Sequence, residues 1–148
     1  GGKPLRDHLE AQGHGEAFEY MLELAGKKEI TENDILMFHR LFYRKIDDTN
    51  AGVYRKSQVF ISGSKYPLPG PDKVPQMMKE VVQKIADIRE KEHPVVAAAK
   101  AHLEFVFVHP FIDGNGRVAR LIMNLVLIQS GYNIALISVI SAILSLFC

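Results

Sequence analysis

Two apolar segments near the end of the chain, separated by a short polar segment, most restrict how this sequence can fold. Residues 95–108 are apolar on nearly all sides, interrupted only by Lys100, His102 and Glu104, and residues 121–129 have the same character. A helix that is apolar all round is normally buried at the centre of a bundle. The two segments therefore predict a central helix pair and an all-α fold around it.

The preceding segments add amphipathic helices to this pair. Apolar residues at helical spacing predict a short first helix over 5–11 and a second over 16–25. Residues 31–34 have the form of a capping box that starts a third helix, and residues 72–92 predict a long fourth one. The length suits one domain, so we expect a single domain over residues 1–148, with truncation at both ends left open.

Residues 52–71 differ from the helical segments. Val59, Phe60 and Ile61 are β-prone, and glycines and prolines follow them closely. We expect a short β-hairpin here. We expect Arg55 to brace this hairpin, with contact to a target or nucleotide as the alternative.

Charge and cysteine usage exclude several classes of function. The net charge is +1, from 18 basic and 17 acidic residues, so nucleic acid is not an expected partner. The single cysteine, Cys148, excludes a disulfide framework, and no secretory signal is visible, which together favour a cytoplasmic protein. Residues 134–148 are apolar or small but shorter than the roughly 20 residues of a membrane span, so a membrane anchor is not expected.

The histidines outside the polar connection are expected to be structural. His8, His14 and His39 are predicted at the surface, and His102 as a buried histidine with satisfied hydrogen bonds. No pair of histidines and acidic residues has the spacing of a zinc site.

The polar connection itself has features of an anion site. Pro110 cannot continue the preceding helix, which holds His109 at the mouth of the core. Gly114 and Gly116 allow backbone conformations closed to other residues and let a ligand approach the main chain. They precede a helix, whose free N–H groups and dipole favour an anion.

Charged side chains around these glycines predict the chemistry. Arg117 and Arg120 share one helix face, and guanidinium groups match phosphate geometry. Asp113 adds a carboxylate suited to a Mg²⁺–phosphate complex, and Asn115 can donate to a phosphoryl oxygen. With an ordinary pKa of about 6.5, His109 can accept a proton near pH 7. Together they predict in-line attack of a hydroxyl on a metal-bound phosphate, without a covalent enzyme intermediate.

Residues 109–120 read His-Pro-Phe-Ile-Asp-Gly-Asn-Gly-Arg-Val-Ala-Arg. This segment resembles the signature of Fic proteins (filamentation induced by cAMP), with all nine fixed positions present. The similarity extends from the early helices through Gly52-x-Tyr54-Arg55 to Gly131. The resemblance implies a protein adenylyltransferase that uses ATP and Mg²⁺ to place AMP on a Ser, Thr or Tyr hydroxyl of a target protein.

The resemblance also implies roles for individual residues. His109 would deprotonate the hydroxyl, Asp113 would hold Mg²⁺, Arg117 would bind the β-phosphate side and Arg120 the γ-phosphate. The implied nucleotide contacts are Asp113, Gly114, Asn115, Gly116, Arg117, Arg120, Val59, Phe60, Ile61 and Ser62. Residues 59–63 (Val59, Phe60, Ile61, Ser62 and Gly63) resemble the family's flap, a hairpin edge that clamps the target by main-chain pairing.

Two departures and several alternatives remain open at this level. Many Fic proteins carry an inhibitory helix whose glutamate pairs with the second motif arginine; no such segment occurs here, and our hypothesis places it upstream of Gly1 or removed. The family's adenine-side wall continues into the segment where this chain ends, so base recognition is not assigned.

The same scaffold could transfer UMP, phosphocholine or phosphate, although Gly116 favours the usual nucleotide orientation because members that transfer phosphate have lysine there. A non-catalytic peptide-binding module is the alternative from another class. The oligomeric state is open, a homodimer included.

Overall fold

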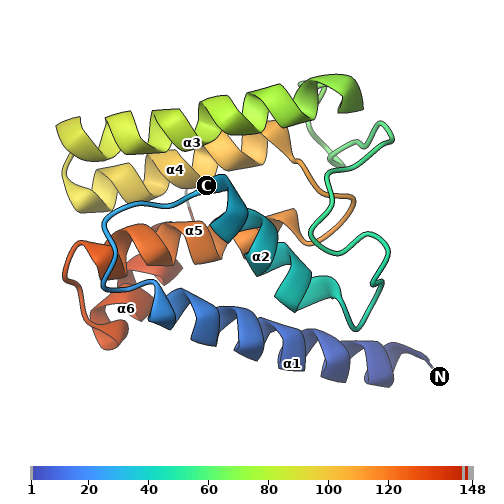
Figure 1. Ribbon diagram of the computed structural model, residues 1–148, viewed down its shortest axis with the longest axis horizontal. Coiled ribbons are helices and arrows are strands. Elements are labelled where there is room, and N and C mark those ends of the chain that lie inside the picture. The colour runs from blue at the N-terminus through green and yellow to red at the C-terminus, as the bar shows by residue number, and fades with distance from the viewer. Residues whose placement is uncertain (1, 145, 147–148) are drawn as a thin grey trace.

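Figure 1 shows the computed structural model of the protein, which describes residues 2–144 and 146 and leaves Cys148 outside the described residues. Within them the chain forms α-helices and one 3-10 helix but no β-strand, which confirms the all-α prediction. The elements are α1 (Gly2–Glu23), α2 (Glu32–Tyr43), η1 (Pro71–Lys73), α3 (Val74–Lys91), α4 (Pro94–Val108), α5 (Asn115–Gln129) and α6 (Ile134–Leu144).

The predicted central pair is present as α4 and α5, which pack along each other (Figure 1). On either side of this pair, α3 covers α4, while α1, α2 and α6 pack on α5. The largest fully buried side chains include Phe38, Phe105, Phe111, Leu121, Ile122 and Met123. The expectation that α4 is buried on all sides holds only in part, because Leu103 and Phe107 face solvent.

The first helix differs from the prediction of two short ones. Residues 2–23 form one continuous helix, α1, that passes through Gly13 and Gly15 without a break. A Cβ on Gly13 would lie 2.4 Å from the Phe42 carbonyl oxygen, so the glycine lets α1 approach α2 closely. This helix-to-helix contact outweighs the low helix propensity of glycine.

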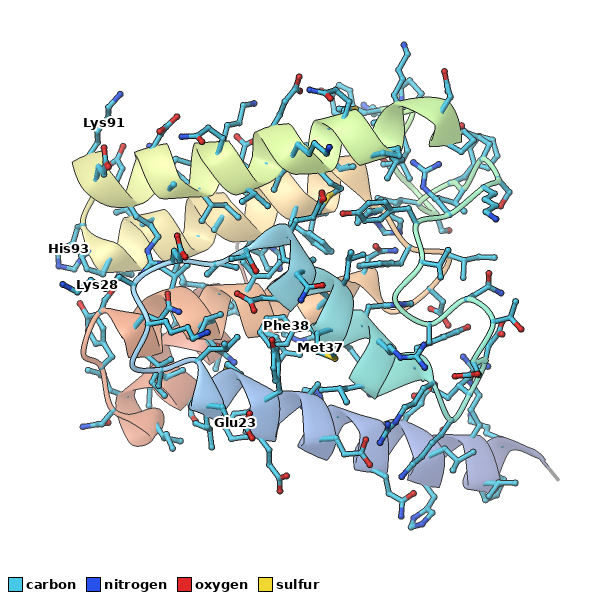
Figure 2. All side chains as sticks on the ribbon, viewed as in Figure 1. Glu23, Lys28, Met37, Phe38, Lys91 and His93 are labelled. Carbon is cyan, nitrogen blue, oxygen red and sulfur yellow. The ribbon has the colours of Figure 1, made fainter. Side chains whose placement is uncertain are left out.

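Helix α2, predicted as the third helix, starts where the capping box predicted it. The Asp34 amide donates to Thr31 Oγ1 (3.1 Å) and the Thr31 amide donates to Asp34 Oδ2 (3.0 Å), a complete capping box. Phe38 then lies between the helices of the bundle, whereas Lys91 at the end of α3 points away from it (Figure 2). The capping box fixes the start of α2 and hence the register of the residues that face the motif.

The predicted β-hairpin within residues 52–71 is wrong. No strand forms in this segment, which is a loop held by Gln58 Nε2 donating to the Leu68 carbonyl (3.1 Å) and by a turn from Ser64 N to Ile61 O (3.1 Å). Proline lacks a backbone N–H, and prolines recur in the returning arm of the loop, so the two arms cannot form a regular ladder. The loop nonetheless exposes apolar side chains, with Phe60 81% exposed.

The apolar end of the chain forms α6. It has 11 residues, and none of the helices in the described part of the chain is long and apolar enough to cross a membrane.

Candidate active site

The site is built on the turn between α4 and α5, called here the motif loop (residues 109–114). His109 follows the last residue of α4 and adopts a left-handed conformation, with φ 52° and ψ 61°. It is the one non-glycine residue of the described chain with positive φ. Glycine is usual at this place because a side chain costs roughly 1–2 kcal/mol there. The backbone of His109 is therefore strained, and this strained conformation places the imidazole at the end of α4.

Gly114 and Gly116 keep the start of α5 open. Gly114 has φ 84°, and a Cβ on it would lie 2.8 Å from the Phe42 ring, so no other residue fits without a shift. At Gly116 a Cβ would come no closer than 3.9 Å to Arg120 Nη1, which leaves the main chain accessible. The Gly114 amide donates to Asp113 Oδ1 (2.8 Å), and no side chain caps the amides that follow it at the start of α5. These uncapped N–H groups suit an anion, and its binding there stays a prediction.

Asn115 closes the motif loop on itself. Its Nδ2 donates to the Phe111 carbonyl (2.8 Å), and its Oδ1 accepts from the Phe111 amide (2.9 Å). Asn115 is 2% exposed, and these two hydrogen bonds hold the main chain of the motif loop. Its contact with a phosphoryl oxygen stays a prediction.

His39, which the sequence placed at the surface, is fully buried beneath the motif loop. Its Nδ1 accepts from the Gly52 amide (2.9 Å), so Nε2 carries the proton and donates to the Asp113 carbonyl (2.9 Å). The ring stacks on Phe111 at 3.9 Å between centroids. Burial lowers the pKa of His39 to about 4, against the opposing effect of Asp113, so the ring is neutral at pH 7. His39 therefore fixes the main chain of the residue predicted to hold Mg²⁺.

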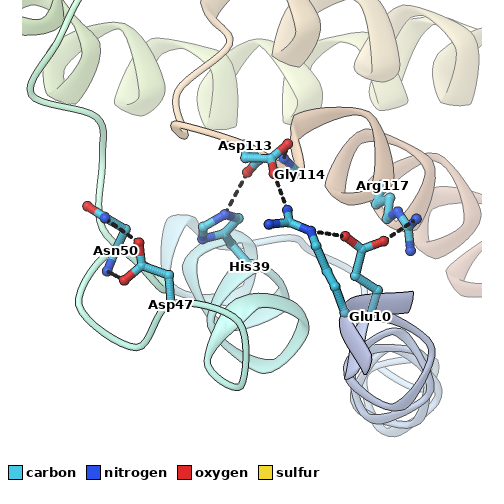
Figure 3. Close-up of polar contacts among 8 residues, drawn as sticks. Glu10, His39, Asp47, Asn50, Asp113, Gly114 and Arg117 are labelled. Carbon is cyan, nitrogen blue, oxygen red and sulfur yellow. Dashed lines mark hydrogen bonds and ion pairs between the residues drawn. The ribbon is translucent and has the colours of Figure 1, made fainter. Parts of the chain in front are cut away.

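The first turns of α1 contribute charged partners that the sequence did not reveal. Arg6 Nη2 pairs with Asp113 Oδ2 (3.0 Å) and Arg6 Nε with Glu10 Oε1 (3.0 Å). Glu10 Oε2 in turn pairs with Arg117 Nη2 (3.0 Å), as Figure 3 shows. Negative and positive side chains therefore alternate from Asp113 through Arg6 and Glu10 to Arg117. These ion pairs link the carboxylate predicted to hold Mg²⁺ to an arginine predicted to bind phosphate.

The two motif arginines have different surroundings. Arg117 is held by Glu10 and lies over the Phe42 ring, with Cζ 5.0 Å from the centroid. Arg120 is exposed, forms no ion pair with another described residue, and lines a cavity of about 340 Å³ beside Asn124 and α6. Arg120 therefore keeps its charge available to a ligand.

His8, His14 and His102 only partly match the prediction. His8 is exposed as expected, but His14 is half-buried, because α1 lies against the start of α5. His102 is buried as expected, yet its Nδ1 has no hydrogen-bond partner within the described residues. Burial first, and then the charge of Arg120, lowers the pKa of His102; the pKa of His14 is lowered by burial and by both motif arginines.

His109 is half-buried, and its surroundings favour the neutral ring. Burial lowers its pKa, the charge of Arg55 lowers it further, and the Val106 carbonyl and Asp113 act in the opposite direction. A neutral imidazole is what a general base needs, so the electrostatics agree with the predicted role.

The Asp113 carboxylate suits a magnesium ion that arrives with a triphosphate. Its side chain is 55% exposed, and within the described residues no group of three histidine, cysteine or acidic side chains is arranged to hold a metal alone. Mg²⁺ in nucleotide sites is commonly bound by one or two carboxylates together with substrate phosphates. The Asp113 carboxylate therefore fits Mg²⁺ that is bound together with a nucleotide.

Residues 29–127 match the family model described as Fic/DOC family, and this match covers α4, the motif loop and most of α5. The chain belongs to the Fic/DOC family. This confirms the resemblance drawn from the motif.

Relatives in the family carry the name protein adenylyltransferase Fic. One from Drosophila willistoni is 39% identical over 137 residues, and one from Drosophila ananassae is 38% identical over 133 residues. Each alignment covers 88% of this chain but 26% of the relative, so the chain spans about a quarter of their length.

Solved structures of the family share the fold. Fic-1 (residues 134–508) from C. elegans has a TM-score of 0.77 at 36% identity, covering 86% of this chain and 38% of that one. A Fic-domain-containing signaling protein from Bacteroides thetaiotaomicron has a TM-score of 0.78 at 31% identity, covering 86% and 50%.

Proposed function

We propose that this chain catalyses protein adenylylation, the transfer of AMP from ATP to a Ser, Thr or Tyr hydroxyl of another protein. The observation that carries the proposal is the left-handed His109, placed beside an uncapped helix start that bears Arg117, Arg120 and Asp113. The names of the relatives support the same activity.

The helix start and the two arginines would bind the triphosphate. The free N–H groups of α5 and the side chains of Arg117 and Arg120 supply positive charge on one side of the motif loop. In this assignment Arg117 faces the β-phosphate and Arg120 the γ-phosphate. Asp113 would hold Mg²⁺, which would neutralise charge on the phosphates and on the departing pyrophosphate.

His109 would then act as the general base. Its neutral ring takes the proton of the target hydroxyl while the hydroxyl oxygen forms a bond to the α-phosphorus of ATP. The bond between the α-phosphorus and the bridging oxygen breaks, and pyrophosphate leaves with the bonding electrons. The positive groups of α5 stabilise the charge that develops on it.

The loop formed by residues 59–63 would receive the target protein. Most of this segment is exposed, and it has no main-chain pairing with a strand in the described chain. Val59 and Phe60 precede the turn at residues 61–64, and their main-chain groups could pair with an extended segment of another chain. We propose that the target segment pairs here and presents its hydroxyl to His109.

Labelled ATP tests the proposal. The chain is incubated with Mg²⁺ and ATP labelled on either the α- or the γ-phosphate, and protein-bound label is measured on the chain itself and on candidate targets. Adenylylation retains only the α-label, whereas retained γ-label would indicate a kinase.

Substitution of the base completes the test. His109→Ala is expected to reduce transfer by at least about 100-fold, the usual contribution of general base catalysis, while ATP binding changes little. His8→Ala, at an exposed position on α1, is the matched control and should behave as the unsubstituted chain. Full transfer by His109→Ala would refute the assignment.

A further inference from the structure

Arg55 is a buried cation without an acidic partner. Its residue is 4% exposed, and no carboxylate in the described part of the chain pairs with it. Burying a charge is unfavourable unless hydrogen bonds compensate it. The compensation comes from four main-chain carbonyls, on Ser57, Pro69, Val108 and His109.

These carbonyls belong to two separate segments. Nε donates to the His109 carbonyl (2.7 Å) and Nη2 to the Val108 carbonyl (3.3 Å), both at the end of α4. Nη2 also donates to the Pro69 carbonyl (2.6 Å) in the loop that contains the flap. The Arg55 amide donates to the Pro110 carbonyl (2.9 Å), so Arg55 holds the main chain on both sides of the His109–Pro110 bond.

The residue held in this way is the strained one. Left-handed backbone at a non-glycine residue persists only where surrounding contacts fix it. The His109 carbonyl accepts a hydrogen bond of 2.7 Å from the charged guanidinium of Arg55. A loss of this bond would free the peptide to move, and the imidazole with it.

We infer that Arg55 is a positioning residue that fixes the main chain of His109, and so the imidazole, relative to the flap loop. The inference rests on the proposed function, in which His109 takes the proton. The contact with a nucleotide or target that the sequence left as the alternative is disfavoured, because the side chain is buried and four of its five N–H donors bond main-chain carbonyls of the protein.

Arg55→Lys tests the inference most directly. Lysine keeps the positive charge but replaces the planar fork by a single ammonium group, which cannot reach the His109 and Pro69 carbonyls together as the guanidinium does. Because a displacement of about 1 Å at a reacting group can cost about 100-fold, we expect kcat to fall by about that factor. KM for ATP should change little, since the phosphate-binding groups lie on α5.

Gln58→Ala is the matched control. Gln58 ties the flap loop to Leu68 but has no hydrogen bond to the motif loop, so its removal should act on KM for the target protein and leave kcat at saturating target unchanged. Equal losses of kcat in both variants, or an unchanged kcat in Arg55→Lys, would overturn the inference.

A second measurement does not depend on transfer. The His109 amide donates to the Phe105 carbonyl (3.1 Å), and its hydrogen exchange can be followed by NMR. Exchange should become faster in Arg55→Lys and stay unchanged in Gln58→Ala; unchanged exchange in both would overturn the inference. If the unsubstituted chain transfers no AMP, the proposed function has failed, and amide exchange then decides the role of Arg55 alone.

If Arg55→Lys folds poorly, a double-mutant cycle of Tm values tests the inference instead. Glycine adopts left-handed backbone without strain, so a His109→Gly background keeps the main-chain carbonyls that Arg55 bonds but has no strain to release. The fall in Tm caused by Arg55→Lys should be larger in that background than in the unsubstituted chain, where release of the strained backbone offsets part of the lost hydrogen bonds. An equal fall in both would show that Arg55 does not constrain His109.

Discussion

Replacement of His39 by glutamine is expected to remove part of the acid sensitivity of the fold. The pKa of His39 is about 4 in the folded protein, against an ordinary value of 6.5, chiefly because the ring is buried. Between these two values the unfolded chain binds a proton that the folded chain does not. The free energy of unfolding must therefore fall as the pH drops from 6.5 towards 4. Above pH 6.5 the His39 ring is neutral in both states, so a further rise in pH no longer changes the free energy of unfolding through this group.

The size of the effect follows from the two pKa values. Lowering the pH from about 7.5 to about 5 should cost about 2 kcal/mol through His39 alone, which corresponds to about 4–8 °C in Tm for a chain of this length. His14, His102 and His109 also have lowered pKa values, so they add to the acid sensitivity of the unsubstituted chain. Their contribution is the same in the His39 variant and cancels in the comparison.

Urea denaturation of the unsubstituted chain and of His39→Gln at the two pH values measures the difference. The variant is expected to be less stable at both, but to lose about 2 kcal/mol less on acidification. His8→Gln, at an exposed position, serves as the control. An identical pH dependence in the unsubstituted chain and His39→Gln would refute the reasoning, because it would mean that His39 is protonated as readily in the folded state as in the unfolded one.

Arg120→Ala should weaken ATP binding more than ADP binding in calorimetry; equal losses would contradict the γ-phosphate assignment. The acid limb of the pH profile of kcat/KM should lie below pH 6.5, because the pKa of His109 is lowered and the neutral ring is the active form; a midpoint at or above 6.5 would assign the limb to another group. Arg6→Gln should lower, by a few-fold at most, the Mg²⁺ concentration that half-saturates ATP binding, because Arg6 pairs with the Asp113 carboxylate at an exposed position. This shift should disappear at high salt and be absent in Arg44→Gln, which breaks an ion pair with α1 elsewhere.

Local patterns predicted the parts of the fold that depend on nearby residues. The central helix pair, the capping box at Thr31 and the uncapped start of α5 at Gly114 all follow from residues within a few positions of each other. The motif loop was predictable for the same reason.

Contacts between distant segments were not predictable from spacing. His39 looks like a polar residue on an amphipathic helix, and only the packing of α2 under the motif loop shows it bonded to Gly52 and Asp113. Arg6 and Glu10 lie about a hundred residues before their partners, and no local signal pairs them with the motif. The hairpin prediction failed because the β-prone residues 59–61 have no partner strand, and sequence propensity alone does not supply one.

The way α5 begins affects how the site can be disabled. The donors that we propose for the anion are main-chain N–H groups, so an exchange of the Arg117 side chain leaves them in place; they are lost if proline is introduced or if Gly114 loses its left-handed backbone. Under the proposed function, such a variant would lose turnover and still retain phosphate. It would then serve as an inactive trap for nucleotide and would compete with the active form for ATP and for targets.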